Sequence, residues 1–245
     1  MSLRRGAWLA AGRHEAEYGA GFKVRSIGGW GGSRRLEKLA NSAATRGMDV
    51  YQWGVYTGGT MRGLARRIRV FGHLWGFDSF EGLPPELRGE PIEGRHWRPG
   101  AFSSADALGE YSLEKLLARL HEKIGYPNTT LVPGFFNVSL TARRGGRAPF
   151  PFQPALLVDV DVDLYVSTMQ CLSWMIANQL LVPGSLVRYD DFRNMRQRNG
   201  EARAHRELTR AHRITWRNLG RRDLNSREWQ VVAIGDPRWV EPSWL

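Results

Sequence analysis

Short apolar segments typical of β-strands alternate with helical segments along most of the chain. The strand-like segments are 48–56, 73–78, 128–136, 154–162 and 184–192. The segments with helical periodicity are 34–47, 60–72, 111–125, 168–181 and 201–213. Two last strands, 214–220 and 229–235, can form an antiparallel hairpin. This order predicts a doubly wound α/β fold with a mostly parallel sheet, whose ligands bind at the carboxyl ends of the strands.

The composition supports a single core without a membrane span. The chain has 245 residues, of which 42% are hydrophobic, enough for one sizeable core or two small ones. No stretch approaches 18 consecutive apolar residues, and the N-terminal residues lack the apolar segment of a secretory signal. One cysteine, Cys171, excludes a disulfide framework. We therefore expect no membrane association and a cytoplasmic location.

Positive charge is concentrated near the C-terminus. The net charge is +11, and residues 193–228 contain eleven arginines against four acids. Such a segment suggests an anionic partner, such as nucleic acid or phosphate. The alternative is a solvated, arginine-biased surface. The sequence contains no zinc-ligand set or RNA-binding signature, so nucleic acid is not the favoured partner.

The first residues differ in composition from the rest. Residues 1–33 are rich in glycine with scattered aromatic side chains. We expect them to form a flexible arm or lid, and residues 34–245 to form one domain.

A glycine-rich turn follows the first predicted strand, in the sequence GVYTGGT at 54–60. Glycine allows a ligand to approach the backbone, and a helix N-terminus offers free N–H groups. Glycine turns are equally common for structural reasons. The spacing is not GxGxxG and no phosphate-binding lysine follows, which argues against a P-loop and against a nicotinamide oxidoreductase.

The second motif is GFDSFEGLP at 76–84. Its Asp78 ends the second predicted strand, where nucleotide-binding α/β folds hold ribose hydroxyls. An alternative role for Asp78 is a helix cap or an Asx-turn.

Acidic residues end two adjacent predicted strands. DVDVDLY supplies Asp159, Asp161 and Asp163, and RYDDF supplies Asp190 and Asp191. Carboxylates that converge repel one another, and a divalent cation such as Mg²⁺ relieves that repulsion. The alternative is that these acids cap helices or pair with arginines, and we expect Asp159 to do the latter.

A general base is harder to assign. Among six histidines, His96 in the long loop after the second strand is the first candidate, and Trp97 and Phe102 beside it are candidates to pack against a cofactor or substrate. Aromatic side chains in such loops equally often serve packing alone.

GVYTGGT, GFDSFEGLP, DVDLYVST and VPGSLVRYDDF occur in this order, and together they resemble the macrocin O-methyltransferase (TylF-type) family. The resemblance spans about residues 45–195. It implies a class I S-adenosylmethionine-dependent methyltransferase with a seven-stranded sheet whose last strand is antiparallel. It also implies a lid at the N-terminus and a small hydroxylated natural product as substrate. A homodimer is common in that family and stays open here.

The resemblance also implies residue roles. Asp161, Asp190 and Asp191 match the Mg²⁺ ligands, and Asp163 orients the site or helps to remove a proton. The glycines of the first motif would wrap the methionine part of S-adenosylmethionine, and Asp78 would hold its ribose. The residues so assigned to the cofactor are Gln52, Gly54, Tyr56, Thr57, Gly58, Gly59, Asp78, Ser79 and Phe80.

Three positions depart from the family pattern. Ser185 follows Gly184 where the family usually has a second glycine. Gln52 stands near the place of a usual acid, which would lower the affinity for the cofactor ammonium. Arg188 replaces an apolar residue before the acidic pair, and it either pairs with a carboxylate or faces outward. The leading hypothesis is therefore a Mg²⁺-dependent O-methyltransferase. The alternatives are a metal-independent methyltransferase, in which Arg188 neutralises the acids, and a nucleic-acid-binding protein that uses residues 193–228.

Overall fold

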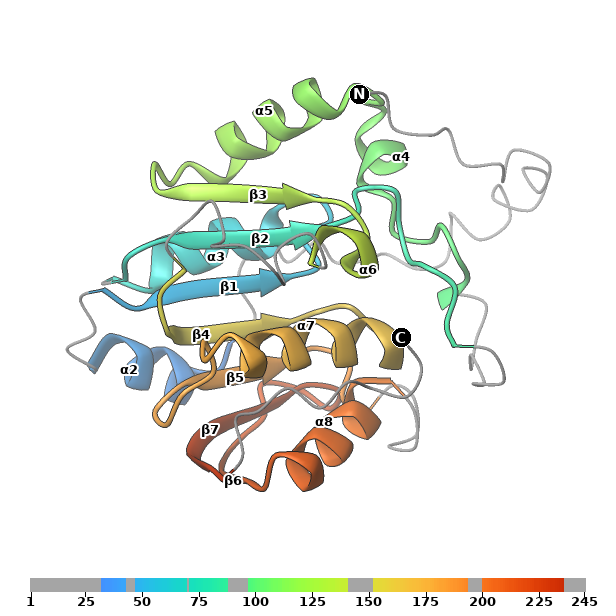
Figure 1. Cartoon of the computed structure of the whole chain (residues 1–245). Coiled ribbons are helices and arrows are strands. Elements are labelled where there is room, and N and C mark those ends of the chain that lie inside the picture. Colours follow the sequence, from blue (N-terminus) through green and yellow to red (C-terminus); the bar gives the residue numbers. More distant parts are fainter. Residues whose placement is uncertain are drawn as a thin grey trace.

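A seven-stranded sheet forms the centre of the computed structural model (Figure 1), which describes residues 32–42, 47–69, 71–87, 97–140, 152–193 and 200–235. The strands are β1 (Asp49–Trp53), β2 (Leu74–Asp78), β3 (Thr129–Pro133), β4 (Ala155–Val160), β5 (Leu186–Tyr189), β6 (Ile214–Gly220) and β7 (Arg227–Ile234). The helices are α2 (Arg34–Ser42), α3 (Gly59–Arg67), α4 (Ser104–Leu108), α5 (Leu113–Ile124), α6 (Phe136–Ser139), α7 (Tyr165–Ala177) and α8 (Gly200–Ala211).

The strand order is β3-β2-β1-β4-β5-β7-β6. Strands β1 to β5 pair in parallel, and β7 runs antiparallel between β5 and β6. The predicted doubly wound fold with a C-terminal antiparallel hairpin is confirmed. The chain moves outward from β1 to β3 and then returns to β4 on the other side, so β1 and β4 flank the switch point where such sheets bind ligands.

Helices cover both faces of the sheet. On one face, Trp53 and Phe77 pack with Trp174 of α7 and Leu208 of α8 in a single buried cluster. On the other face, a second cluster joins the sheet to α2, α3 and α5. Because both faces are covered, the parallel strands are buried along their length: all residues of β1, β4 and β5 are buried.

Local signals set the ends of α5. The Ser112 hydroxyl accepts a hydrogen bond from the Lys115 N–H at its start, and Gly125 adopts a left-handed conformation at its end. The predicted helix at 111–125 is therefore nearly the observed one.

The start of α7 depends on a residue far away in the sequence. It begins at Tyr165, three residues before the predicted start, because the Glu86 carboxylate accepts hydrogen bonds from the N–H groups of Tyr165 and Val166. The short helices α4 and α6 were not predicted. Among the described residues, no helix combines the length and apolar character that a membrane span requires.

His205 of α8 is buried among aromatic side chains, and this burial predicts how the stability of the fold depends on pH. Burial, with a smaller effect of Arg206, lowers the pKa of His205 to about 3. The unfolded chain binds this proton near pH 6.5, so this histidine destabilises the fold as the pH falls from about 6.5 towards 3, by at most about 1.4 kcal/mol per pH unit. In urea unfolding across this range, we expect His205→Leu to lose stability less steeply than the wild type. If the free energy of unfolding depended equally on pH in the two proteins, this prediction would be wrong.

Candidate functional site

A cavity of about 970 Å³ opens at the carboxyl ends of β1, β2, β4 and β5. Gly54 and Asp78 line it from the ends of β1 and β2, and Asp161 and Asp190 line it from the ends of β4 and β5. This volume is typical of a site for a cofactor and a small substrate. The cavity lies at the predicted edge of the sheet.

Gly54 lies in close contact with the chain that follows β4. Its φ is +82°, and a Cβ built on it would lie 1.9 Å from the Asp161 carbonyl oxygen. The Asp161 N–H donates to the Trp53 carbonyl at 3.0 Å, which holds the two strand ends together. Glycine is therefore required here because any side chain would push Asp161 away.

Asp78 organises the turn after β1. Its Oδ2 accepts hydrogen bonds from the N–H groups of Val55 (2.7 Å) and Tyr56 (2.8 Å), and its Oδ1 accepts one from Phe80 (2.6 Å). Burial raises the pKa of Asp78, and these three hydrogen bonds oppose the rise. The Asx-turn considered for Asp78 is thus present, and the same carboxylate also lines the cavity.

The other residues assigned to the cofactor lie around this turn in two groups. Tyr56 and Ser79 line the cavity together with Gly54 and Asp78. The remainder do not line the cavity: Gln52, Thr57, Gly58, Gly59 and Phe80. Gln52 is fully buried, and its Oε1 has no hydrogen-bond partner within the described part of the chain.

The loop after β2 forms one wall of the cavity. The parts of this loop at 79–87 and 97–103 are joined by a hydrogen bond, in which the Leu83 N–H donates to the Ala101 carbonyl at 2.8 Å. Phe102 lies at the rim, 47% exposed, with its ring edge-on to Tyr56 at 6.1 Å. His96 lies outside the described residues, as does most of the expected arm at 1–33.

Three carboxylates from two strand ends converge in the cavity. One oxygen each of Asp161, Asp190 and Asp191 lies within 4.8 Å of the others. Burial, followed by the charges of Asp190, Asp159 and Asp191, raises the pKa of Asp161 well above its usual value. A divalent cation would relieve this repulsion, and carboxylate oxygens are the ligands that Mg²⁺ prefers. The donor set therefore fits such a cation.

Asp163 lies beside this group in a left-handed conformation, with φ +59°. Its Oδ1 accepts a hydrogen bond of 2.6 Å from the indole N–H of Trp97, which the sequence indicated only as a packing residue. Burial raises the pKa of Asp163 to about 6, and hydrogen bonds with Asp191 and Trp97 oppose the rise.

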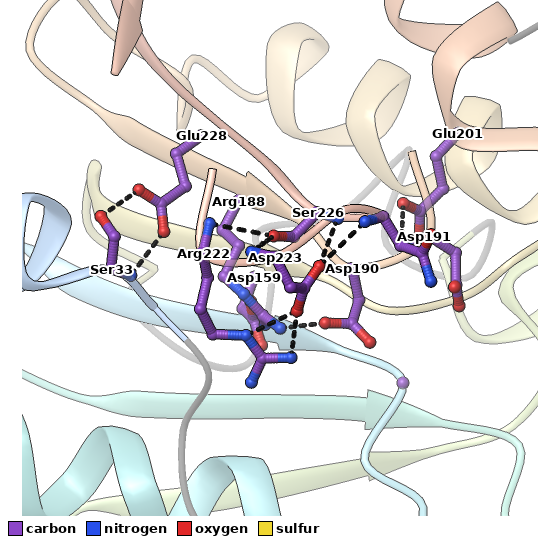
Figure 2. Close-up of polar contacts among 12 residues, drawn as sticks. Ser33, Asp159, Arg188, Asp190, Asp191, Glu201, Arg222, Asp223, Ser226 and Glu228 are labelled. Atoms are coloured by element: carbon purple, nitrogen blue, oxygen red, sulfur yellow. Dashed lines mark hydrogen bonds and ion pairs between the residues drawn. The ribbon is translucent and has the colours of Figure 1, made fainter. Parts of the chain in front are cut away.

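The side chain of Arg188 faces inward, whereas the sequence left open whether it pairs with a carboxylate or faces outward. It is 2% exposed, and its guanidinium pairs with both Asp159 and Asp190 (Figure 2). The expected pairing of Asp159 with an arginine is confirmed. Burial acts to lower the pKa of Arg188, but Asp159 and Asp190 raise it above its ordinary value, so the side chain is charged.

Glu201 was not identified from the sequence, because it lies at the start of a helix among surface-type residues. It is fully buried, and its carboxylate accepts hydrogen bonds from the N–H groups of Val162 (3.4 Å) and Asp191 (3.0 Å). It therefore ties together the two loops that carry the acidic residues.

We expect Glu201→Ala to destabilise the protein by about 2 kcal/mol or more, because it leaves the buried Val162 N–H and the partly buried Asp191 N–H without an acceptor. Glu201→Gln keeps one oxygen acceptor and is the matched control, with a smaller loss. Urea unfolding measures both. Equal losses for the two variants would contradict this role.

No protein-family model and no curated protein matches the sequence. Solved structures are similar in fold. The calicheamicin methyltransferase CalS11 is 18% identical with a TM-score of 0.57, over 80% of this chain and 75% of that one. The O-methyltransferase NovP is 22% identical with a TM-score of 0.55, over 81% and 79%. TomG of Streptomyces achromogenes, an O-methyltransferase of tomaymycin synthesis solved with S-adenosylmethionine, is 16% identical with a TM-score of 0.50, over 81% and 78%.

Proposed function

The chain has the Rossmann-like fold of these methyltransferases, and we propose that it is an S-adenosylmethionine-dependent O-methyltransferase that uses Mg²⁺ and acts on a small hydroxylated natural product. One observation carries the proposal. The acidic group of Asp161, Asp190 and Asp191 shares a single cavity with the turn at Gly54 and Asp78, at the switch point of the sheet.

The proposed cofactor site is the β1 end of the cavity. Gly54 allows the methionine part of the cofactor to approach the backbone, and Asp78 accepts hydrogen bonds from the ribose. Gln52 does not line the cavity, and its side-chain amide donates to the Gly54 carbonyl at 2.9 Å, so it is proposed to serve the cofactor by supporting this turn. Tyr56 and Phe102 line the rim, where their rings would pack against the adenine.

The proposed cation site is the β4 and β5 end, with Asp161, Asp190 and Asp191 as ligands. Mg²⁺ bound there would lower the pKa of a substrate hydroxyl and hold its oxygen in place. Asp163 is proposed to accept the proton of that hydroxyl, since it lines the same cavity and Trp97 holds its carboxylate.

The remaining task of the protein is to align the reacting groups and exclude water. A methyl group on a sulfonium already has a good leaving group, so alignment of oxygen, carbon and sulfur is the main requirement. Apolar residues such as Leu83, Phe136 and Val166 line the cavity and lower its water content. His96 is proposed as an alternative base, and the arm at 1–33 as a lid.

Membership of the TylF-type family is part of the proposal. It rests on the four sequence motifs and on the similarity of the fold to NovP and CalS11. The proposed substrate class comes from the same resemblance. The tomaymycin pathway named for TomG belongs to that protein and gives this chain no specific substrate.

Calorimetry with S-adenosylhomocysteine tests the cofactor part of the proposal. We expect binding to the wild type and no binding of NADH. Loss of S-adenosylhomocysteine binding in Asp78→Ala, with the fold retained, would support the ribose role. No binding to the wild type would overturn the proposal. An oligonucleotide affinity with a steep salt dependence would instead favour a nucleic-acid-binding protein that uses residues 193–228.

A further inference from the structure

A row of buried polar side chains crosses the sheet beneath the acidic group. Gln52 of β1 pairs in register with Asp159 of β4, Asp159 with Arg188 of β5, and Arg188 with Glu228 of β7. All four are almost inaccessible to solvent. Residues in register on neighbouring strands point to the same face, so this row is continuous. Buried polar groups are costly unless they are paired, which makes the row an unusual feature of a sheet centre.

Arg188 is the member of the row that reaches the cavity. Its Nη1 donates to Asp159, which is fully buried, and its Nη2 donates to Asp190, whose side chain is 31% exposed. Figure 2 shows the guanidinium between the two carboxylates. Arg188 is thus held from the interior by Asp159 and holds Asp190 at the cavity wall.

We propose that Arg188 is a positioning residue that fixes the Asp190 carboxylate for a bound divalent cation and thereby sets the affinity of the site. This inference rests on the proposed function, in which Asp190 is one of three ligands. A carboxylate that coordinates a cation commonly receives a hydrogen bond on its other side, and loss of such a partner costs 10–100-fold in metal affinity or activity. The planar guanidinium suits this role because its two Nη groups can hold two carboxylates at once.

Asp159 and Arg188 can be replaced together at constant net charge. Asp159 and Arg188 form a buried pair of zero net charge. Replacing both with apolar residues keeps the net charge of the region and removes the contact between Arg188 and Asp190 without leaving Asp159 as an unpaired buried charge. It also removes two buried atoms that lack partners among the described residues, Asp159 Oδ2 and Arg188 Nε. Replacement of a whole buried pair is usually tolerated, whereas removal of one partner is not.

The test compares Mn²⁺ affinities of the full chain by calorimetry, without cofactor or substrate. The variants are Asp159→Leu/Arg188→Met and Arg188→Lys. Arg67→Met is the control, because Arg67 pairs with Glu37 and does not line this cavity. We expect the double variant to bind about 10–100-fold more weakly than the wild type. Arg188→Lys should show a smaller loss, since lysine keeps the charge without the fork, and Arg67→Met should bind as the wild type does.

The outcomes are distinct. An unchanged affinity in the folded double variant would mean that Arg188 only joins β4 to β5. A tighter affinity would mean that Arg188 competes with the cation, as in the metal-independent alternative. Either result overturns the inference while the proposed cation site stands. If circular dichroism shows that the double variant is unfolded, Arg188→Lys decides, and an affinity equal to the wild type overturns the inference. A wild type that binds no Mn²⁺ overturns the cation site, and with it the role of Arg188.

Discussion

Asp161→Ala is expected to weaken Mn²⁺ binding by at least about 100-fold. The loss of a residue that only hydrogen-bonds to a metal ligand would cost less. Asp161 supplies one of the three oxygens that lie within 4.8 Å of one another, and it follows β4 whereas Asp190 and Asp191 follow β5. The fold should survive, because burial and the neighbouring charges already make the ionised form of Asp161 unfavourable. Calorimetry with Mn²⁺ measures the affinity, and binding of S-adenosylhomocysteine should be retained.

Asp106→Ala is the matched control for this variant. Asp106 is an exposed acid of α4 outside the cavity lining, so its loss changes the net charge equally without touching the site. Its Mn²⁺ affinity should equal that of the wild type. An Asp161→Ala protein that binds Mn²⁺ as tightly as this control would show that Asp161 is no ligand.

Gly54→Ala is expected to lower stability by about 3 kcal/mol or more and to abolish cofactor binding. An alanine at φ +82° costs about 1–2 kcal/mol for its left-handed conformation. Its Cβ would also lie 1.9 Å from the Asp161 carbonyl oxygen, so the ends of β1 and β4 must move apart, at a further cost of about 1–3 kcal/mol. Urea unfolding and calorimetry with S-adenosylhomocysteine measure the two effects.

Gly184→Ala separates the two causes. Gly184 has φ +99°, and a Cβ there would meet no atom within 4 Å. It should therefore show only the conformational cost and bind the cofactor normally. Equal destabilisation of the two variants would contradict the account of close contact between β1 and β4.

The sheet and most of its helices could be predicted from the sequence, because their signals are local. The alternation of apolar segments with helical ones sets the topology, and the Ser112 and Gly125 caps set the ends of α5. The start of α7 could not be predicted in this way. It depends on Glu86, which is 79 residues away from Tyr165.

The candidate site could likewise be predicted only in part. The convergence of Asp161 with Asp190 and Asp191 followed from the rule that parallel strands end at one edge of a sheet. The direction of Arg188 did not follow, because it depends on the register that sets Asp159 opposite Arg188 across β4 and β5. Glu201 and Trp97 were missed as partners of the acidic loops for a related reason. Each reaches the site from a separate element, through contacts that no local spacing indicates.

A crystal structure of the protein with Mn²⁺ and S-adenosylhomocysteine tests the central claim most directly. The account predicts an anomalous peak between Asp161, Asp190 and Asp191, at ligand distances of about 2.1 Å, beside a cofactor that lies over Gly54. Arg188 should still hold Asp190 from behind. A cofactor in place with no metal peak among these three aspartates would contradict the account.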